Sequence, residues 1–248
     1  MGTREQYLDA LGIDRWSVRV RAAAQPLESL PLPDAAAPSL PAAPLAAEAD
    51  MAPNPAQLPA PGHDENDWQS LQAQVSGCER CELCRTRTQT VFGVGNRSAR
   101  LLVIGEAPGA EEDRQGEPFV GRAGQLLNSM LRAMGHPRES VYIANVLKCR
   151  PPGNRDPTPA EVAQCLPYLQ RQVQLLQPRL ILAVGRIAAQ NLLATDTPIG
   201  RLRGQLHQFA STPLIVTYHP AYLLRSPGEK RKAWLDLKAA SAELARAH

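Results

Sequence analysis

Five cysteines are the residues whose spacing points most directly to chemistry. Cys78, Cys81 and Cys84 follow one another at intervals of three residues, whereas Cys149 and Cys165 come much later in the chain. A local group of thiols and two distant thiols can converge on one site, and both zinc and iron–sulfur clusters accept four thiolates. The alternative is that Cys149 and Cys165 are buried as small apolar side chains and only the local group binds metal. Because such a site takes four thiolate ligands, one of the five cysteines would not bind the metal.

A second candidate is the turn Gly-Glu-Ala-Pro-Gly at residues 105–109, directly after a short apolar run. Two glycines and a proline shape a turn that lets a ligand approach the backbone closely. The turn lacks the Lys-Ser/Thr of a phosphate-binding loop and the glycine spacing of a dinucleotide fingerprint, so phosphate binding has little support. Its carboxylate, Glu106, is followed by an acidic run at 111–113 whose simpler interpretation is a solvated loop.

Three more side chains stand where a ligand can reach them. Phe119 lies in a loop bracketed by glycines, although it also suits the core. Asn145 ends an apolar run, and its amide offers one donor and one acceptor together, which suits the edge of a pyrimidine; the alternative is a turn residue. His219 precedes Pro220 and a segment of leucines and basic residues, whereas a lone histidine is usually structural.

Secondary-structure elements must position these residues, and the hydrophobic pattern of the sequence predicts alternating strands and helices. Strands are expected at 101–104, 141–146, 180–184, 205–209 and 214–218, and helices at 68–75, 124–134, 159–176 with Thr158 as N-cap, 185–193 and 229–246. Such alternation indicates a parallel or mostly parallel sheet between layers of helices. Ligands bind at the carboxyl ends of such strands, which selects 105–109, 145–148 and 218–225.

The amino-terminal part has a different composition from the rest. Residues 26–61 contain ten Pro and eleven Ala, too little side chain to offset ordering entropy, so 26–67 is expected to be a disordered Pro/Ala-rich linker. Residues 1–25 can form one short helix, as a frayed terminus or as a segment that docks on a protein partner. The domain is expected at 68–248. It carries 23 Lys and Arg against 14 Asp and Glu, whereas 1–67 carries 4 against 10.

The apolar runs, the first ten residues and the number of cysteines indicate where in the cell the protein is expected. No run approaches the roughly 18 apolar residues of a membrane span, so no membrane association is expected. The first ten residues include Arg4, Glu5 and Asp9 where a signal peptide needs an apolar core. An odd number of cysteines fits a reducing compartment better than a disulfide framework. We therefore expect a cytoplasmic protein, and nothing in the sequence requires more than a monomer.

The chain resembles the family 4 uracil-DNA glycosylases, which carry an iron–sulfur cluster. Four blocks in order carry the resemblance and span about 68–245: Gly105-Glu106-Ala107-Pro108-Gly109 with Glu112-Asp113, Pro118-Phe119-Val120-Gly121, Asn145 with Lys148-Cys149-Arg150-Pro151-Pro152, and His219-Pro220-Ala221-Tyr222-Leu223-Leu224-Arg225. The resemblance implies a three-layer α/β/α sandwich around a central four-stranded parallel sheet. It implies a 4Fe-4S cluster held by Cys78, Cys81, Cys149 and Cys165, with Cys84 spare.

The resemblance also implies how uracil is recognised and released. Phe119 matches the aromatic that stacks on the flipped base, and Asn145 the residue that bonds uracil O4 and N3. His219 matches the donor to uracil O2, and Glu106 the carboxylate that faces the sugar, as a base or as an electrostatic partner. Ala107 stands where the best-known uracil glycosylases carry Asp. Glu112 is the reserve carboxylate and is expected to contact the substrate.

The remaining expectations concern DNA and the outcome of the reaction. Leu223 and Leu224 match a loop that enters the duplex, and Arg225, Arg231 and Lys232 are expected to neutralise phosphates. The sequence has no histidine between His136 and His207, which favours hydrolysis over covalent trapping of DNA. Free uracil and an abasic site are the expected products in base excision repair. The alternatives are a DNA-binding module for deaminated bases that keeps a structural cluster but does not cut, and a cluster-bearing redox protein.

Overall fold

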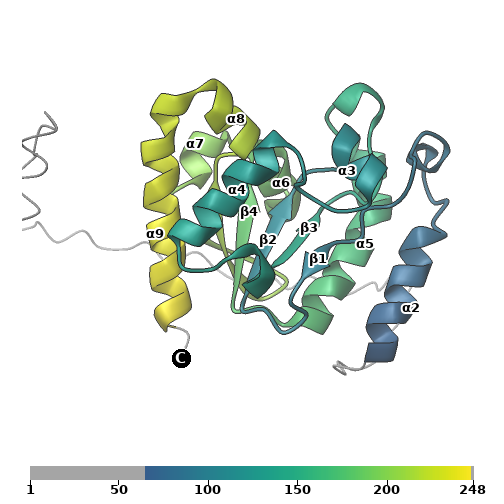
Figure 1. Cartoon of the computed structure of the whole chain (residues 1–248), viewed down its shortest axis with the longest axis horizontal. Coiled ribbons are helices and arrows are strands. Elements are labelled where there is room, and N and C mark those ends of the chain that lie inside the picture. Colours follow the sequence, from purple (N-terminus) through teal and green to yellow (C-terminus); the bar gives the residue numbers. More distant parts are fainter. Residues whose placement is uncertain (1–64, 247–248) are drawn as a thin grey trace, which may run out of the picture. The chain divides into compact units, whose positions relative to one another are not determined.

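The fold is built on one six-stranded sheet in a computed structural model that describes residues 65–246 (Figure 1). Its strand order is β1-β3-β2-β4-β6-β5, and the bounds are β1 Val94–Gly95, β2 Leu101–Gly105, β3 Tyr142–Asn145, β4 Leu180–Val184, β5 Leu206–Phe209 and β6 Thr212–Thr217. The four inner strands pair in parallel, whereas β1 and β5 pair antiparallel to their neighbours.

Helices cover both faces of this sheet. Their bounds are α2 Glu65–Ser76, α3 Ala110–Gln115, α4 Arg122–Ala133, α5 Pro159–Leu176, α6 Arg186–Leu193, α7 Ile199–Leu202, α8 Pro220–Arg225 and α9 Lys230–Arg246. Short 3₁₀ helices occupy Glu82–Arg85, Arg138–Ser140, Pro152–Asn154 and Pro227–Glu229. Side chains of α2, α5, α6 and α7 pack into the core on one face, and those of α4, α8 and α9 into the core on the other.

The inner strands are apolar on both sides because both sides are covered. In β2, Leu102 and Ile104 belong to the core under α5, while Leu101 and Val103 belong to the core under α4 and α9. All five residues of β2 are buried, as are all five of β4. Continuous apolar runs of this kind are typical of parallel strands between two helical layers. The predicted α/β class and its layered arrangement are thereby confirmed.

The sheet has more strands than the four-stranded parallel sheet that the resemblance implies. Its parallel part is the inner four strands, and β1 and β5 add an antiparallel strand at each edge. With only two residues, β1 is too short to produce a periodic pattern. The hairpin between β5 and β6 turns through Ala210 and Ser211, both with positive φ (47° and 64°), the conformation that tight hairpin turns require.

Local signals placed most helix ends correctly. The Thr158 hydroxyl accepts a hydrogen bond from the Glu161 backbone N–H at 3.3 Å, and Glu161 Oε2 accepts one from the Thr158 N–H at 2.8 Å. This capping box confirms the predicted start of α5. Three predictions differ: 65–67 belong to α2 and not to the linker, the acidic run at 111–113 lies in α3, and 220–225 is helical. The predictions for residues 1–64 lie outside the described residues.

Among residues 65–246, none of the helices combines the length and the apolar composition that crossing a membrane requires.

Candidate active site

A cleft of about 450 Å³ opens at the carboxyl ends of the parallel strands. It is lined by all the residues predicted to act on or contact the base and sugar, which are Glu106, Ala107, Glu112, Phe119, Asn145 and His219. The first three follow β2, Asn145 ends β3, and His219 follows β6. Because the carboxyl ends of parallel strands meet at one edge of the sheet, segments far apart in the sequence converge there.

The side chains of Asn145 and Phe119 pack directly against the backbone of Gly105. Gly105 and Asn145 are register partners on β2 and β3. A Cβ atom on Gly105 would lie 2.4 Å from Asn145 Oδ1 and 2.6 Å from Phe119 Cζ, so only glycine fits. Asn145 is 2% exposed, and its Oδ1 has no hydrogen-bond partner within the described part of the chain. A buried polar atom without a partner in a cleft is a ready acceptor for a ligand.

Phe119 is held in an unusual backbone conformation beside His219. Its φ is 55°, a left-handed value that a bulky residue adopts only when its surroundings enforce it. The two rings lie 5.7 Å apart between centroids, at an interplanar angle of 30°. Arg138 stabilises this loop, since its Nη2 donates to the Pro118 carbonyl at 2.6 Å and to Glu117 Oε1 at 2.8 Å.

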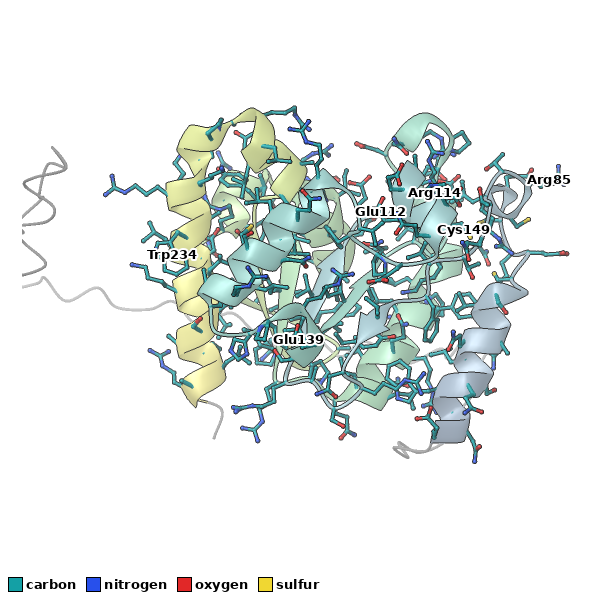
Figure 2. All side chains as sticks on the ribbon, viewed as in Figure 1. Arg85, Glu112, Arg114, Glu139, Cys149 and Trp234 are labelled. Atoms are coloured by element: carbon teal, nitrogen blue, oxygen red, sulfur yellow. The ribbon has the colours of Figure 1, made fainter. Side chains whose placement is uncertain are left out.

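Glu112 holds two loops together (labelled in Figure 2). Its Oε2 accepts a hydrogen bond from the Gly109 N–H at 3.1 Å. Its Oε1 accepts from the N–H groups of Val120 at 3.1 Å and Gly121 at 3.3 Å. Both carboxylate oxygens are therefore engaged with the backbone. Glu112 lines the cleft and, through these bonds, positions the loop that carries Phe119.

Glu106 is the half-buried carboxyl group of the cleft. Burial, together with the negative charge of Asp156 and against the opposing charge of Arg186, raises its pKa to about 7. A carboxyl group with a pKa near neutral changes charge easily at physiological pH, which is typical of active-site acids and bases. Its backbone carbonyl accepts from the Leu147 N–H at 3.0 Å, which ties the turn after β2 to the segment after β3.

His219 is a neutral hydrogen-bond donor. Burial, together with the positive charge of Arg225 and against the opposing charge of Glu112, lowers its pKa to about 4. Its Nδ1 accepts from the Ala221 N–H at 3.1 Å, so the ring proton lies on Nε2. Gly185, with φ of 102°, lets the ring lie close: a Cβ atom there would be 3.0 Å from His219 Cβ.

Four of the five cysteines surround a second cavity. Cys78, Cys81, Cys149 and Cys165 line it, and Cys84 is outside the lining. Among the described residues, no group of three or more His, Cys, Asp or Glu side chains is arranged to hold a single metal ion. The thiols thus border a shared space instead of meeting at a point. Cys149 is labelled in Figure 2.

A guanidinium and a backbone N–H donate to sulfur atoms of this cavity. Arg87 Nη1 donates to Cys149 Sγ at 3.1 Å and to the Cys78 carbonyl at 2.8 Å. The Lys148 backbone N–H donates to Cys165 Sγ at 3.2 Å. Burial raises the pKa of Cys165 to about 11, and the Lys148 charge and N–H oppose that shift. These donors favour thiolates over thiols.

The predicted DNA-contacting residues divide into exposed and buried ones. Leu223 is 1% exposed and packs in the core between α4 and α9, so its predicted entry into the duplex is wrong. Leu224, on the other side of α8, is 38% exposed. Arg225 lines the cleft, Arg231 is exposed, and Lys232 is exposed with its Nζ 3.0 Å from Glu229 Oε1.

Some residues of the cleft carried no sequence signal. Arg155 and Asp156 line its rim. Arg155 donates to both oxygens of Glu161, at 2.8 and 2.6 Å, and this contact sets its position. Arg138 reaches the Phe119 loop from a 3₁₀ helix nineteen positions later, which no local pattern reveals.

Comparison with known proteins agrees with this geometry. The model of the uracil DNA glycosylase superfamily matches residues 92–238. The type-4 uracil-DNA glycosylase of Archaeoglobus fulgidus is 46% identical over 173 residues, which is 66% of this chain and 87% of that protein. The type-4 enzyme of Pyrobaculum aerophilum is 41% identical over 179 residues, 69% of this chain and 91% of the relative. That of Thermotoga maritima is 44% identical over 158 residues, 63% of this chain and 82% of the relative. A chain that shares this superfamily's sequence pattern and brings its pattern residues into one cleft belongs to the uracil-DNA glycosylase superfamily, alongside the type-4 enzymes.

Proposed function

We propose that this protein excises uracil from DNA by hydrolysing the N-glycosidic bond, which releases free uracil and leaves an abasic site for base excision repair. The observation that carries the proposal is the convergence of Glu106, Phe119, Asn145 and His219 on one cleft from three separate strand ends. The names of the relatives support the same reaction.

Recognition of the base uses the buried amide and the aromatic ring. An enzyme that acts on a base in DNA flips it out of the stack into a pocket. Phe119 offers the stacking face, and the unpaired Oδ1 of Asn145 accepts from uracil N3–H while its Nδ2 donates to O4. Cytosine presents the opposite donor and acceptor pattern at that edge. A mismatched buried polar pair costs about 1–3 kcal/mol, so cytosine is rejected.

His219 stabilises the leaving group. As the glycosidic bond breaks, negative charge develops on uracil, and a fixed donor aimed at O2 lowers the free energy of that state. The Ala221 N–H occupies Nδ1, so Nε2–H is the donor. With a pKa of about 4, the ring remains neutral at physiological pH and retains this proton.

Glu106 acts on the sugar side of the bond. The same bond breaking leaves positive charge on the deoxyribose, which a nearby carboxylate stabilises while it orients the attacking water. With a pKa of about 7, a substantial fraction of Glu106 is ionised at neutral pH. Ala107 also lines the cleft and leaves Glu106 as the carboxylate of this turn with unengaged oxygens, since Glu112 binds backbone amides.

We also propose a 4Fe-4S cluster held by Cys78, Cys81, Cys149 and Cys165. The donor set fits, because four thiols line one cavity and cationic Arg87 and Lys148 adjoin it. When bound, the cluster would supply a covalent cross-link between the segment at 78–87 and α5. No step of base excision passes through it. Cys84 remains a free thiol outside this set.

The DNA surface is proposed around α8 and the start of α9. Leu224 is exposed beside the cleft and can fill the space that the flipped base leaves. Arg225, Arg231 and Lys232 neutralise phosphates, so affinity should fall as salt concentration rises.

Incubation with an oligonucleotide that carries one uracil tests the function. Alkali treatment then cleaves the strand wherever a base has been removed. Cleavage at the uracil, and none in a matched strand with thymine at that position, is the expected result. An intact uracil strand at enzyme excess would refute the proposal. A brown sample with visible absorption supports iron, whereas a colourless sample speaks against the cluster.

A further inference from the structure

Lys148 is a buried lysine that the reaction described above does not use. Its side chain is 1% exposed and lies in the core between the cleft and the thiol cavity. The Nζ atom donates to the Asn145 backbone carbonyl at 2.9 Å and to Gln172 Oε1 at 2.6 Å. Gln172 Nε2 in turn donates to the Phe92 carbonyl at 2.9 Å. The Lys148 ammonium is therefore hydrogen-bonded to the backbone of Asn145, the residue proposed to recognise the base edge.

The charge of Lys148 has no carboxylate partner within residues 65–246. A buried ammonium surrounded by neutral acceptors is unfavourable unless another negative group compensates it. The residue also adjoins the cysteines: Lys148 lines their cavity, and its backbone N–H donates to Cys165 Sγ at 3.2 Å.

The same segment also reaches the catalytic turn. The Val146 N–H donates to the Gly105 carbonyl at 2.9 Å, and the Leu147 N–H donates to the Glu106 carbonyl at 3.0 Å. Cys149 ends the segment at the thiol cavity. Residues 146–149 thus connect Asn145, the turn of Glu106 and the thiol cavity.

We propose that Lys148 is a positioning residue that holds the uracil-reading amide of Asn145 from the side of the thiol cavity. This inference rests on the function proposed above. The ammonium fixes the Asn145 peptide at the end of β3, and so fixes the direction of its side chain into the cleft. Without the ammonium, the Asn145 carbonyl loses its buried donor and the amide no longer meets the base edge at the required geometry.

A double-mutant cycle on the iron-loaded full chain tests this. The variants are Lys148→Met, Asn145→Ala and the combination, and the readout is the single-turnover rate of uracil excision. Lys148→Met is expected to slow excision about tenfold or more, because a buried carbonyl is left without its donor. In the Asn145→Ala background, the same change should alter the rate by less than about twofold, because a residue that acts through Asn145 has nothing left to position.

Two further variants and a second readout separate positioning from a general loss of structure. Lys238→Met removes an exposed lysine of α9 and should behave as the parent protein. Iron content and visible absorption are measured for every variant. If Lys148→Met does not retain iron, Gln172→Leu replaces it in the cycle, because this change keeps the ammonium and removes one of its two acceptors.

The outcomes are distinct. Additive losses, or a parent rate for Lys148→Met with full iron content, overturn the positioning role. A parent rate for Asn145→Ala overturns the role of Asn145 in base reading, and the proposal for Lys148 falls with it. Absence of uracil excision by the parent protein overturns the proposed function itself.

Discussion

The Nδ1 atom of His219 accepts a hydrogen bond from the backbone N–H of Ala221, at 3.1 Å. The cap that begins α8 therefore also decides which ring nitrogen carries the proton. Burial keeps the pKa of the ring at about 4, so this tautomer persists through the physiological range. One ring nitrogen of His219 caps α8, and the other is the proposed donor to uracil O2.

His219→Ala should lower the excision rate about 100- to 1000-fold, the usual cost of removing one donor to a developing anion. The loss is expected in the single-turnover rate, measured on a uracil oligonucleotide at saturating enzyme. Affinity for an abasic-site strand, measured by fluorescence anisotropy, should change little. Equal losses in rate and affinity would mean that His219 binds DNA instead of stabilising uracil.

The pH dependence of the rate should report Glu106. If the ionised carboxylate is the active form, kcat/KM rises with pH and levels off above about 7, where burial has placed its pKa. His219 adds no transition between pH 5 and 9, because its pKa is about 4. Glu106→Gln should be slower by about 100-fold and show a flat profile. An unchanged ascending limb in this variant would assign the transition to another group.

The same carboxyl group should weaken the fold at high pH. Its pKa is raised in the folded state, from 4.5 to about 7, so the folded state holds its proton more tightly than the unfolded chain does. The stabilising effect of the protonated form is present below pH 4.5 and is lost as pH rises through 7. Glu106→Gln should therefore be more stable than the parent at pH 8, by about 1 kcal/mol after allowance for partial exposure, and equal at pH 4. Urea unfolding at both pH values measures this; a less stable variant at pH 8 would contradict it.

Gly105→Ala should displace the side chains of Asn145 or Phe119 that line the cleft. The new Cβ would meet Asn145 Oδ1 at 2.4 Å and the Phe119 ring at 2.6 Å, so one of them must move. Overpacking of this kind costs about 1–3 kcal/mol of stability, and uracil excision should fall with it. Gly200→Ala is the matched control, because no atom lies within 4 Å of its Cβ position. Comparable behaviour of the two variants in thermal unfolding and excision would disprove the close packing.

Removal of single thiols tests the proposed cluster ligands. Cys165→Ser should lose iron, visible absorption and thermal stability, because Cys165 lines the thiol cavity. Cys84→Ser should keep all three at parent levels, because Cys84 is outside the lining. Iron analysis on purified proteins decides between them. Loss of iron from Cys84→Ser would move that residue into the ligand set.

Much of the frame was predictable because its signals are local. The apolar run at 101–104, the box formed by Thr158 and Glu161, and the helix at 159–176 depend on neighbouring residues, and the structure has them as predicted. The strand at 205–209 was also predicted and is β5, whereas edge strand β1 was missed because two residues leave almost no pattern.

The sequence by itself determined the α/β order, the strand ends at which polar residues stand, and the motifs of the superfamily. Only the tertiary structure decided what each side chain touches. Leu223 lies in the core, Glu112 binds backbone amides, and Lys148 lines the thiol cavity while its Nζ donates to the Asn145 carbonyl. The physical reason is that periodicity and caps depend on residues a few positions apart. Burial and buried hydrogen bonds depend on partners that the fold brings from far along the chain.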